Sequence, residues 1–161
     1  SDDHTPTNPV VAHAIERHQA SGETIDHVCC IYPTAPFLQS ADLQAGWSVM
    51  AEGAFRYAFA VASYAYPVQR ALRRLPGGGV DMLHPEHRAA RSQDLEEAWH
   101  DAGQFYWGDA AAFVEGLPIF APHAAPVVLP RWRVHDIDTP EDWTRAELMF
   151  QALMGQGRTT L

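Results

Sequence analysis

Apolar and polar residues follow one another along this chain in a pattern that predicts helices separated by short strands. In "TNPVVAHAIERHQASGE", apolar residues at positions 10, 11, 14 and 15 are spaced for one helix face. Asn8 is placed to cap this helix, Pro9 suits its first turn, and Gly22 lies just beyond its end. The run "IDHVCCIY" predicts a short buried strand that the turn residues of "PTAPF" close. A second helix, "SADLQAGWSVMAEG", is predicted to begin at Ser40.

The middle of the chain is rich in aromatic and small residues. "YAFAVASYAYPVQRAL" predicts two extended segments on either side of residues Ser63 to Pro67. The following "LPGGGVD" predicts a turn. Three consecutive glycines can cradle a phosphate, but no strand–loop–helix pattern with a lysine surrounds them here, so the tip of a hairpin is the favoured interpretation.

Towards the C-terminus, strands and helices alternate again. "GQFYWGDAAAFVEG" predicts a strand and then a helix capped by Asp109, and "HAAPVVLPRWRVHDID" predicts the last strand. "PEDWTRAELMFQALM" predicts the last helix, with Trp143, Leu148 and Leu153 on or near its buried face. This alternation predicts an α/β fold in which helices cover both faces of a sheet.

Composition narrows the class of protein. The 161 residues are 47% hydrophobic and 19% charged, which is typical of one globular domain with a real core. The net charge of −9 argues against general binding to nucleic acid or anionic lipid, and no apolar run approaches the roughly 20 residues of a membrane span. All eleven basic residues are arginine. Phosphate chemistry in these residues would therefore need arginine, backbone amides or a metal ion.

The two cysteines, Cys29 and Cys30, are adjacent within the apolar run "VCCIY". Neighbouring residues on a strand face opposite sides of the sheet, which disfavours a disulfide framework. We therefore expect a reducing compartment, the cytoplasm, and a buried structural role for both thiols in preference to a redox role.

Asp136 and Asp138 form the strongest candidate site. If the strand before them persists, residues two apart point to the same side of the sheet. Thr139 is then a good N-cap for the last helix, and Asp142 stands where a capping-box acid belongs. Two carboxylates this close repel each other, and a divalent cation such as Mg²⁺ relieves the repulsion. The alternative is that Asp136 is a surface acid and Asp138 a plain helix-entry residue.

Further candidates lie on two loops and one strand. Tyr32 and Thr34, in "YPTAPFL", follow the first strand at its carboxyl end, where two prolines stiffen the loop. Such loops can also be purely structural. Arg91, in "RSQDL", can fork onto a carboxylate or phosphate, although an exposed arginine often has no special role. Gln104 and Tyr106 alternate on the "GQFYW" strand and are predicted to share one face.

Three motifs in order, "CCIYPTAPFL", "RSQDLEEAWHDAGQFYWG" and "DIDTPEDWTRAE", resemble the pseudaminic acid cytidylyltransferases, relatives of the CMP-sialic acid synthetases. The resemblance spans nearly the whole chain. It implies a Rossmann-like, three-layer nucleotidyltransferase fold. It also implies an enzyme that uses CTP and Mg²⁺ to activate a nine-carbon 2-keto acid sugar, releases pyrophosphate and forms a homodimer.

The resemblance also implies roles for individual residues. Asp136 and Asp138 match the family's paired metal-binding aspartates, which makes them the catalytic candidates. Tyr32 stands where the sialic acid enzymes carry a sugar-contacting glutamine, and Ala102 precedes Gly103 where relatives have Asn-Gly. The residues that the resemblance places at the sugar are Tyr32, Thr34, Arg91, Gln104 and Tyr106, and those that it places at the nucleotide are Thr5 and Thr7.

One family feature has no counterpart in these residues. The family opens with a strand and a glycine-rich loop, bearing arginine and lysine, that wraps the triphosphate. We therefore expect residues 1–161 to be the C-terminal two-thirds of a single cytidylyltransferase domain, incomplete at the N-terminus and inactive alone, with a dimerisation segment around residues 67–90. The alternative is a non-catalytic sugar- or nucleotide-binding module on the same fold.

Overall fold

The computed structural model describes residues 5–156, and its elements occur in the order that the sequence pattern predicts. The helices are α1 (Thr7–Ala20), α2 (Ser40–Ala51), α3 (Ala110–Val114) and α4 (Pro140–Gln156). The strands are β1 (His27–Ile31), β2 (Tyr57–Ser63), β3 (Leu72–Arg74), β4 (Val80–Met82), β5 (Trp99–Asp109) and β6 (Ala124–Val128). Single 3₁₀ turns lie at η1 (Val68–Arg70), η2 (Pro85–His87), η3 (Ser92–Asp94) and η4 (Arg131–Arg133).

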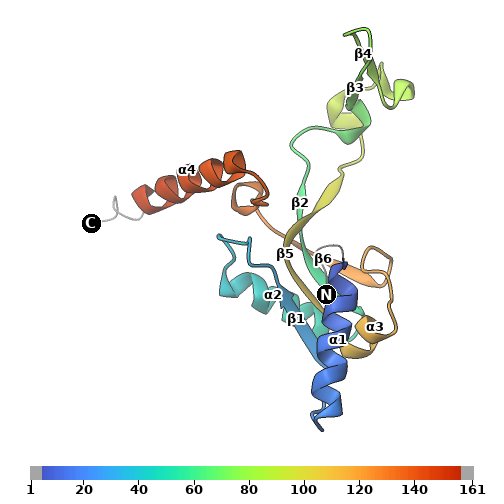
Figure 1. The fold of residues 1–161 in the computed structure, drawn as a ribbon. Coiled ribbons are helices and arrows are strands. Elements are labelled where there is room, and N and C mark those ends of the chain that lie inside the picture. The colour runs from blue at the N-terminus through green and yellow to red at the C-terminus, as the bar shows by residue number, and fades with distance from the viewer. Residues whose placement is uncertain (1–4, 157–161) are drawn as a thin grey trace.

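Four of the strands form a mixed sheet in the order β1-β5-β2-β6 (Figure 1). β2 and β6 pair in parallel, whereas β5 runs antiparallel to both β1 and β2. The carboxyl ends of β1, β2 and β6 therefore meet at one edge of the sheet, together with the N-terminal end of β5. This edge is where ligands bind in open α/β sheets.

Helices cover both faces of the sheet, which confirms the predicted three-layer α/β fold. On one face, Met50 of α2 packs in a buried cluster with Ala60, Phe105 and Val127. On the other face, α1 and α3 cover a second buried cluster that includes Ile15, Tyr57 and Phe113. Burial of apolar side chains on both sides of the strands is the main stabilising term of this architecture.

The adjacent cysteines divide between these two faces. Cys29 packs against the cluster under α2, and Cys30 packs against the clusters on the opposite face. Both thiols are free and half-buried, as a structural role requires. Burial, with a smaller contribution from Cys30, raises the pKa of Cys29 to about 11.

This raised pKa predicts slow alkylation of Cys29. At pH 7.5 the thiolate fraction of Cys29 falls about 100-fold below that of an ordinary thiol, because each unit of pKa changes the fraction tenfold. The rate of modification by iodoacetamide, followed by peptide mass spectrometry, is expected to rise about tenfold per pH unit up to pH 10. A rate at Cys29 that levels off below pH 9, as for a free-cysteine peptide, would contradict the raised pKa.

Several predicted boundaries are confirmed. The second helix begins at Ser40, and the glycine run forms the tip of a hairpin between β3 and β4, in which the amide of Leu75 donates to the carbonyl of Gly79. Thr139 and Asp142 make the predicted capping box: the Thr139 amide donates to the Asp142 carboxylate at 3.0 Å, and the Asp142 amide donates to the Thr139 hydroxyl at 3.2 Å.

Other local predictions are wrong. α1 begins at Thr7, so Asn8 lies inside the first turn, and its amide donates to the carbonyl of Leu117. β1 is half-buried, because nothing described pairs with its outer edge. Asp109 stands at the N-cap of α3 but makes no capping bond; its carboxylate pairs with Arg56 at 2.6 Å.

α4 also departs from its predicted packing. Trp143 and Leu148, predicted on or near the buried face, are 58% and 61% exposed, and Leu153 is half-buried. The buried residue of the helix is Ala146. Figure 1 shows the reason: α4 extends away from the sheet, so most of its surface meets no other described element.

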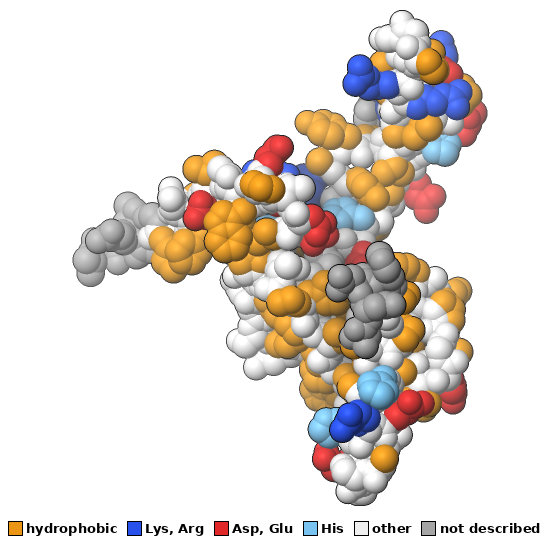
Figure 2. Space-filling model, in the orientation of Figure 1, with side chains coloured by type: hydrophobic (Ala, Val, Ile, Leu, Met, Phe, Trp, Pro, Cys, Tyr) orange, Lys and Arg blue, Asp and Glu red, His pale blue; other side chains and the backbone are white. Residues whose placement is uncertain are grey.

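Residues 64–98, here called the arm, project from the same end of the sheet as α4 but in a different direction (Figure 1). The arm carries the β3–β4 hairpin and three of the 3₁₀ turns. Figure 2 shows arginine and apolar side chains side by side on its surface. Its exposed large apolar residues include Tyr66, Leu72, Val80 and Leu83.

In the described part of the chain, no helix is both long enough and apolar enough to cross a membrane.

Candidate functional site

A hollow of about 580 Å³ opens beside the carboxyl end of β1. One wall is polar, with hydroxyl groups from Thr7, Tyr32 and Tyr106 and the carboxylate of Asp101. The remaining wall is largely apolar. The residues that line the hollow are Pro6, Thr7, Asn8, Tyr32, Asp101, Tyr106, Pro118, Ile119 and Phe120. A site with one apolar wall and a few convergent polar groups is typical of small-molecule binding.

Hydrogen bonds fix the polar wall of the hollow. The Tyr106 hydroxyl donates to Asp101 Oδ2 at 2.5 Å, and the Gly103 amide donates to Asp101 Oδ1 at 3.0 Å. The rings of Tyr32 and Tyr106 lie 5.3 Å apart, and the Tyr32 hydroxyl is bonded to that of Thr7. Burial and the neighbouring Asp101 raise the pKa of Tyr106, so its hydroxyl remains protonated and able to donate.

A bulge in β5 brings Asp101 and Tyr106 together. Residues five apart on a regular strand face opposite sides of the sheet. In β5, however, Asp101 pairs with Val61 and Tyr106 pairs with Phe59, so residues 102–105 lie opposite the single residue 60. Gly103 makes the bulge possible, because its φ of +59° is a backbone conformation that residues with a Cβ rarely adopt.

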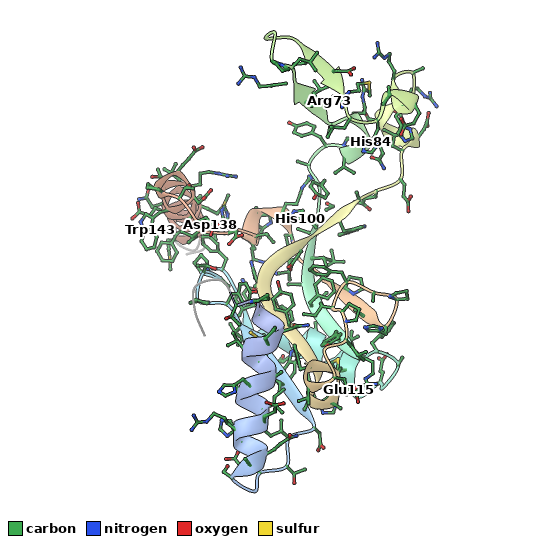
Figure 3. The ribbon with its side chains drawn as sticks, turned by 45° about the vertical axis from the view of Figure 1, so that its right-hand side comes forward. Arg73, His84, His100, Glu115, Asp138 and Trp143 are labelled. Atoms are coloured by element: carbon green, nitrogen blue, oxygen red, sulfur yellow. The ribbon has the colours of Figure 1, made fainter. Side chains whose placement is uncertain are left out.

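Asp136 and Asp138 lie in a loop, contrary to the predicted persistence of the last strand. β6 ends at Val128, the chain turns through η4, and residues 134–139, here called the acidic loop, lead into α4. Pro130 contributes to the early end of the strand because it has no backbone donor. Both aspartates are exposed at the sheet edge that carries the hollow. Figure 3 shows Asp138 at the same end of the molecule as His100, with Glu115 at the other end.

The carboxylate of Asp136 is in an acidic environment. Although Asp136 is exposed at the surface, the protein around its carboxylate displaces part of the water there, which raises its pKa, and the negative charges of Asp138, Asp142 and Asp101 raise it further. A Cβ at Gly103 would lie 4.0 Å from Asp136 Oδ2, so Asp136 approaches β5 next to the backbone that holds Asp101. The acidic loop and the hollow are therefore neighbours.

The acidic loop suits a hard cation only in part. In residues 5–156, no group of three or more His, Cys, Asp and Glu side chains is arranged to hold a metal ion. Asp142 is already committed to capping Thr139. The remaining pair, Asp136 and Asp138, matches the way Mg²⁺ is commonly bound, through one or two carboxylates plus waters and substrate phosphates. The donor set therefore fits Mg²⁺ shared with a phosphate ligand.

The structure brings some of the predicted residues together and leaves others apart. Thr7, Tyr32 and Tyr106 line the hollow, and Thr5 lies just before its rim. Thr34 is half-buried in the loop after β1 and is not part of the wall. Arg91 lies on the arm, where its guanidinium is bonded to Asp94 at 2.7 and 3.1 Å.

Gln104 is not among the residues that line the hollow with Tyr106. Its side chain is fully buried, and its amide nitrogen donates to the carbonyl of Arg133 at 2.7 Å.

Three residues that line the hollow are not marked as site residues by the sequence pattern: Asp101, Ile119 and Phe120. Asp101 reaches the hollow only through the bulge, and its odd spacing from Tyr106 argues against a shared site in a regular strand. Ile119 and Phe120 lie in the irregular segment after α3, where no period marks a face. Gly103 is the sequence signal that could have pointed to Asp101, because a glycine inside a strand often marks a bulge.

Named proteins from two bacterial species are similar to this chain. The chain is 40% identical over 151 residues to the pseudaminic acid cytidylyltransferase of Campylobacter jejuni subsp. jejuni serotype O:2, and 39% identical to that of serotype O:23/36. Each match covers 94% of this chain and 65% of the relative, so the chain spans about two-thirds of their length.

A third relative, from Helicobacter pylori, is named as a pseudaminic acid cytidylyltransferase and UDP-2,4-diacetamido-2,4,6-trideoxy-beta-L-altropyranose hydrolase. It is 31% identical over 138 residues, which is 85% of this chain and 26% of the relative. No protein-family model matches the chain.

The fold and these matches indicate the nucleotidyltransferase class of enzymes. The named relatives are nucleotidyltransferases, and the three-layer α/β structure of this chain is consistent with their Rossmann-like fold. Within that class, the resemblance to the pseudaminic acid cytidylyltransferases is confirmed over 94% of the chain.

Proposed function

We propose that the protein containing this chain transfers CMP from CTP to a nine-carbon 2-keto acid sugar, pseudaminic acid, and releases pyrophosphate. One observation supports this most directly. In a chain 40% identical to a named pseudaminic acid cytidylyltransferase, the hollow and the acidic loop adjoin at the carboxyl ends of β1, β2 and β6. Phosphoryl transfer depends chiefly on positioning and on charge neutralisation, and these two neighbouring features would supply both.

In this proposal the hollow holds the sugar. Tyr32, Tyr106 and Asp101 offer donors and acceptors for its hydroxyl and amide groups, while Ile119 and Phe120 pack against its apolar substituents. Thr7 bonds to Tyr32 on the same wall, so a nucleotide contact at Thr7 would lie next to the sugar. Such proximity is what an attack by a sugar hydroxyl on the α-phosphorus requires.

Asp136 and Asp138 would hold Mg²⁺, which when bound offsets the negative charge of the phosphates and of the attacking oxygen. The raised pKa of Asp136 means that its carboxylate takes up a proton at a higher pH than an ordinary aspartate does. Because only the ionised form binds a cation, the affinity of this site for Mg²⁺ falls as the pH drops through that raised pKa.

The proposal is tested by a pyrophosphate-release assay with CTP, Mg²⁺ and pseudaminic acid on the protein that contains this chain. We expect turnover that depends on all three, and we propose that residues 1–161 alone bind the sugar without turnover. Calorimetry that shows tight sugar binding indifferent to Mg²⁺, with no pyrophosphate released by the longer protein, would instead indicate a non-catalytic binding module.

We further propose that the protein is a cytoplasmic homodimer and that the arm contributes to the interface. The arm presents Tyr66 at 83% exposure, Val80 at 61% and Leu72 at 59%, which is unusual for side chains of this size in one small projection. Light scattering should give the mass of a dimer. Replacement of Leu72 and Val80 by serine should shift the equilibrium towards monomer.

A further inference from the structure

A buried polar network joins the hollow to the acidic loop. It consists of Asp42 on α2, Arg133 in η4 and Gln104 on β5, together called the clamp. The three residues are 7%, 8% and 0% exposed, and they are the buried polar or charged residues of the described chain. None of the three lines the hollow.

The first half of the clamp is a two-pronged ion pair. Arg133 Nη1 donates to Asp42 Oδ2 at 2.5 Å, and Nη2 donates to Oδ1 at 2.9 Å. Asp42 Oδ2 also accepts the amide of Gln39, so α2 holds this carboxylate in place. A bidentate pair fixes the orientation of the guanidinium as well as its position. Arg133 is therefore anchored three residues before Asp136.

The second half of the clamp is the amide of Gln104. Its Nε2 donates to the carbonyl of Arg133 at 2.7 Å, whereas its main-chain carbonyl, as part of β5, accepts the main-chain amide of Tyr32 at 2.9 Å. The Gln104 side chain thus ties the chain that enters the acidic loop to β5, the strand that forms part of the hollow wall. It also follows Gly103, against which the Asp136 carboxylate lies.

Stability alone does not explain these residues. Gln104 Oε1 is buried and has no hydrogen-bond partner among the described residues, which carries a desolvation cost that an apolar side chain would avoid. A buried ion pair is likewise often no more stabilising than well-packed apolar residues of similar volume. Unlike apolar contacts, the directional hydrogen bonds of the clamp fix the distance and the orientation of the acidic loop relative to β5.

We propose that Gln104, Arg133 and Asp42 are positioning residues that hold the acidic loop at a set distance from the hollow. This inference rests on the proposed function: the clamp keeps the Asp136–Asp138 pair where a cation can reach both its carboxylates and a phosphate beside the bound sugar. The clamp touches no substrate and acts only through the two segments that it joins.

Two variants test the clamp without leaving a buried charge unpaired. Gln104→Met keeps the side-chain volume and removes both polar atoms. The double variant Asp42→Met/Arg133→Met replaces the ion pair by apolar contacts, an exchange that proteins often tolerate. The matched control is Arg56→Met, which removes an ion pair of 2.6 Å to Asp109 at the opposite end of β5.

The first measurement is hydrogen exchange of the acidic loop, which needs no activity. We expect amides of residues 134–139 to exchange at least several-fold faster in both clamp variants than in the parent, and at the parental rate in Arg56→Met. Parental exchange in both clamp variants, or equal acceleration in Arg56→Met, would overturn the proposal.

The second measurement separates positioning from general destabilisation. We expect the Mg²⁺ concentration for half-maximal CMP transfer to rise about tenfold in Gln104→Met, as when the outer-shell partners of a metal ligand are removed. In Arg56→Met it should stay at the parental value. An unchanged Mg²⁺ requirement in Gln104→Met refutes the positioning role. No CMP transfer by the parent would refute the proposed function instead, and the exchange rates would still decide the clamp.

Discussion

Replacing Asp138 by alanine in the protein that contains this chain is expected to lower the turnover number for CMP transfer by about 100-fold or more while the fold stays intact. Asp138 is exposed, and the hydrogen bond assigned to it is made by its backbone amide to Asp142, so its carboxylate contributes little to packing. Its removal takes away one of the two proposed ligands of Mg²⁺ and one of the charges that raise the pKa of Asp136.

The measurement is the steady-state rate of pyrophosphate release at saturating CTP and sugar, with Mg²⁺ titrated to high concentration. Glu141→Ala is a matched control, because Glu141 is an exposed acid in the first turn of α4, directly after the acidic loop. Circular dichroism should show both variants folded. Near-normal turnover of Asp138→Ala at saturating Mg²⁺ would exclude the proposed role of Asp138.

Replacing Gly108 by alanine is expected to have the largest effect on stability. An alanine Cβ at this position would lie 2.5 Å from Tyr57 Cδ1 and 2.6 Å from Phe113 Cε2. Both rings are buried, at 0% and 1% exposure, and they pack edge to face with centroids 5.1 Å apart, so neither can move aside. Overpacking of this kind costs about 3 kcal/mol. In a domain of this size, that corresponds to a fall in melting temperature of about 6–12 °C.

Thermal unfolding followed by circular dichroism tests this expectation. Gly77→Ala is the control, since a Cβ there meets nothing within 4 Å. It should leave the melting temperature within about 1 °C of the parent, as surface substitutions usually do. A Gly108→Ala protein as stable as Gly77→Ala would mean that the core beneath β5 is looser than the structure indicates.

Local signals in the sequence determined much of this protein. The start of α2 at Ser40, the glycine hairpin, the Thr139–Asp142 capping box and the opposite packing of Cys29 and Cys30 all depend on residues near one another in the chain. Turn chemistry, capping and strand alternation act over a few residues, so a pattern can reveal them. The three motifs likewise identified the resemblance that the comparisons confirm.

Tertiary structure decided the rest, because contacts between distant segments outweigh local preference. The bulge at Gly103 brings Asp101 to the hollow. The side chain of Gln104 joins the clamp by a bond to Arg133, which lies 29 residues away in sequence. Asp42 and Arg133 lie 91 residues apart, and the sequence gives no sign that one needs the other. Trp143 is exposed because α4 leaves the sheet, although its spacing is that of a buried face. A period in the sequence shows that a helix or strand has two different faces; only the packed chain determines what each face meets.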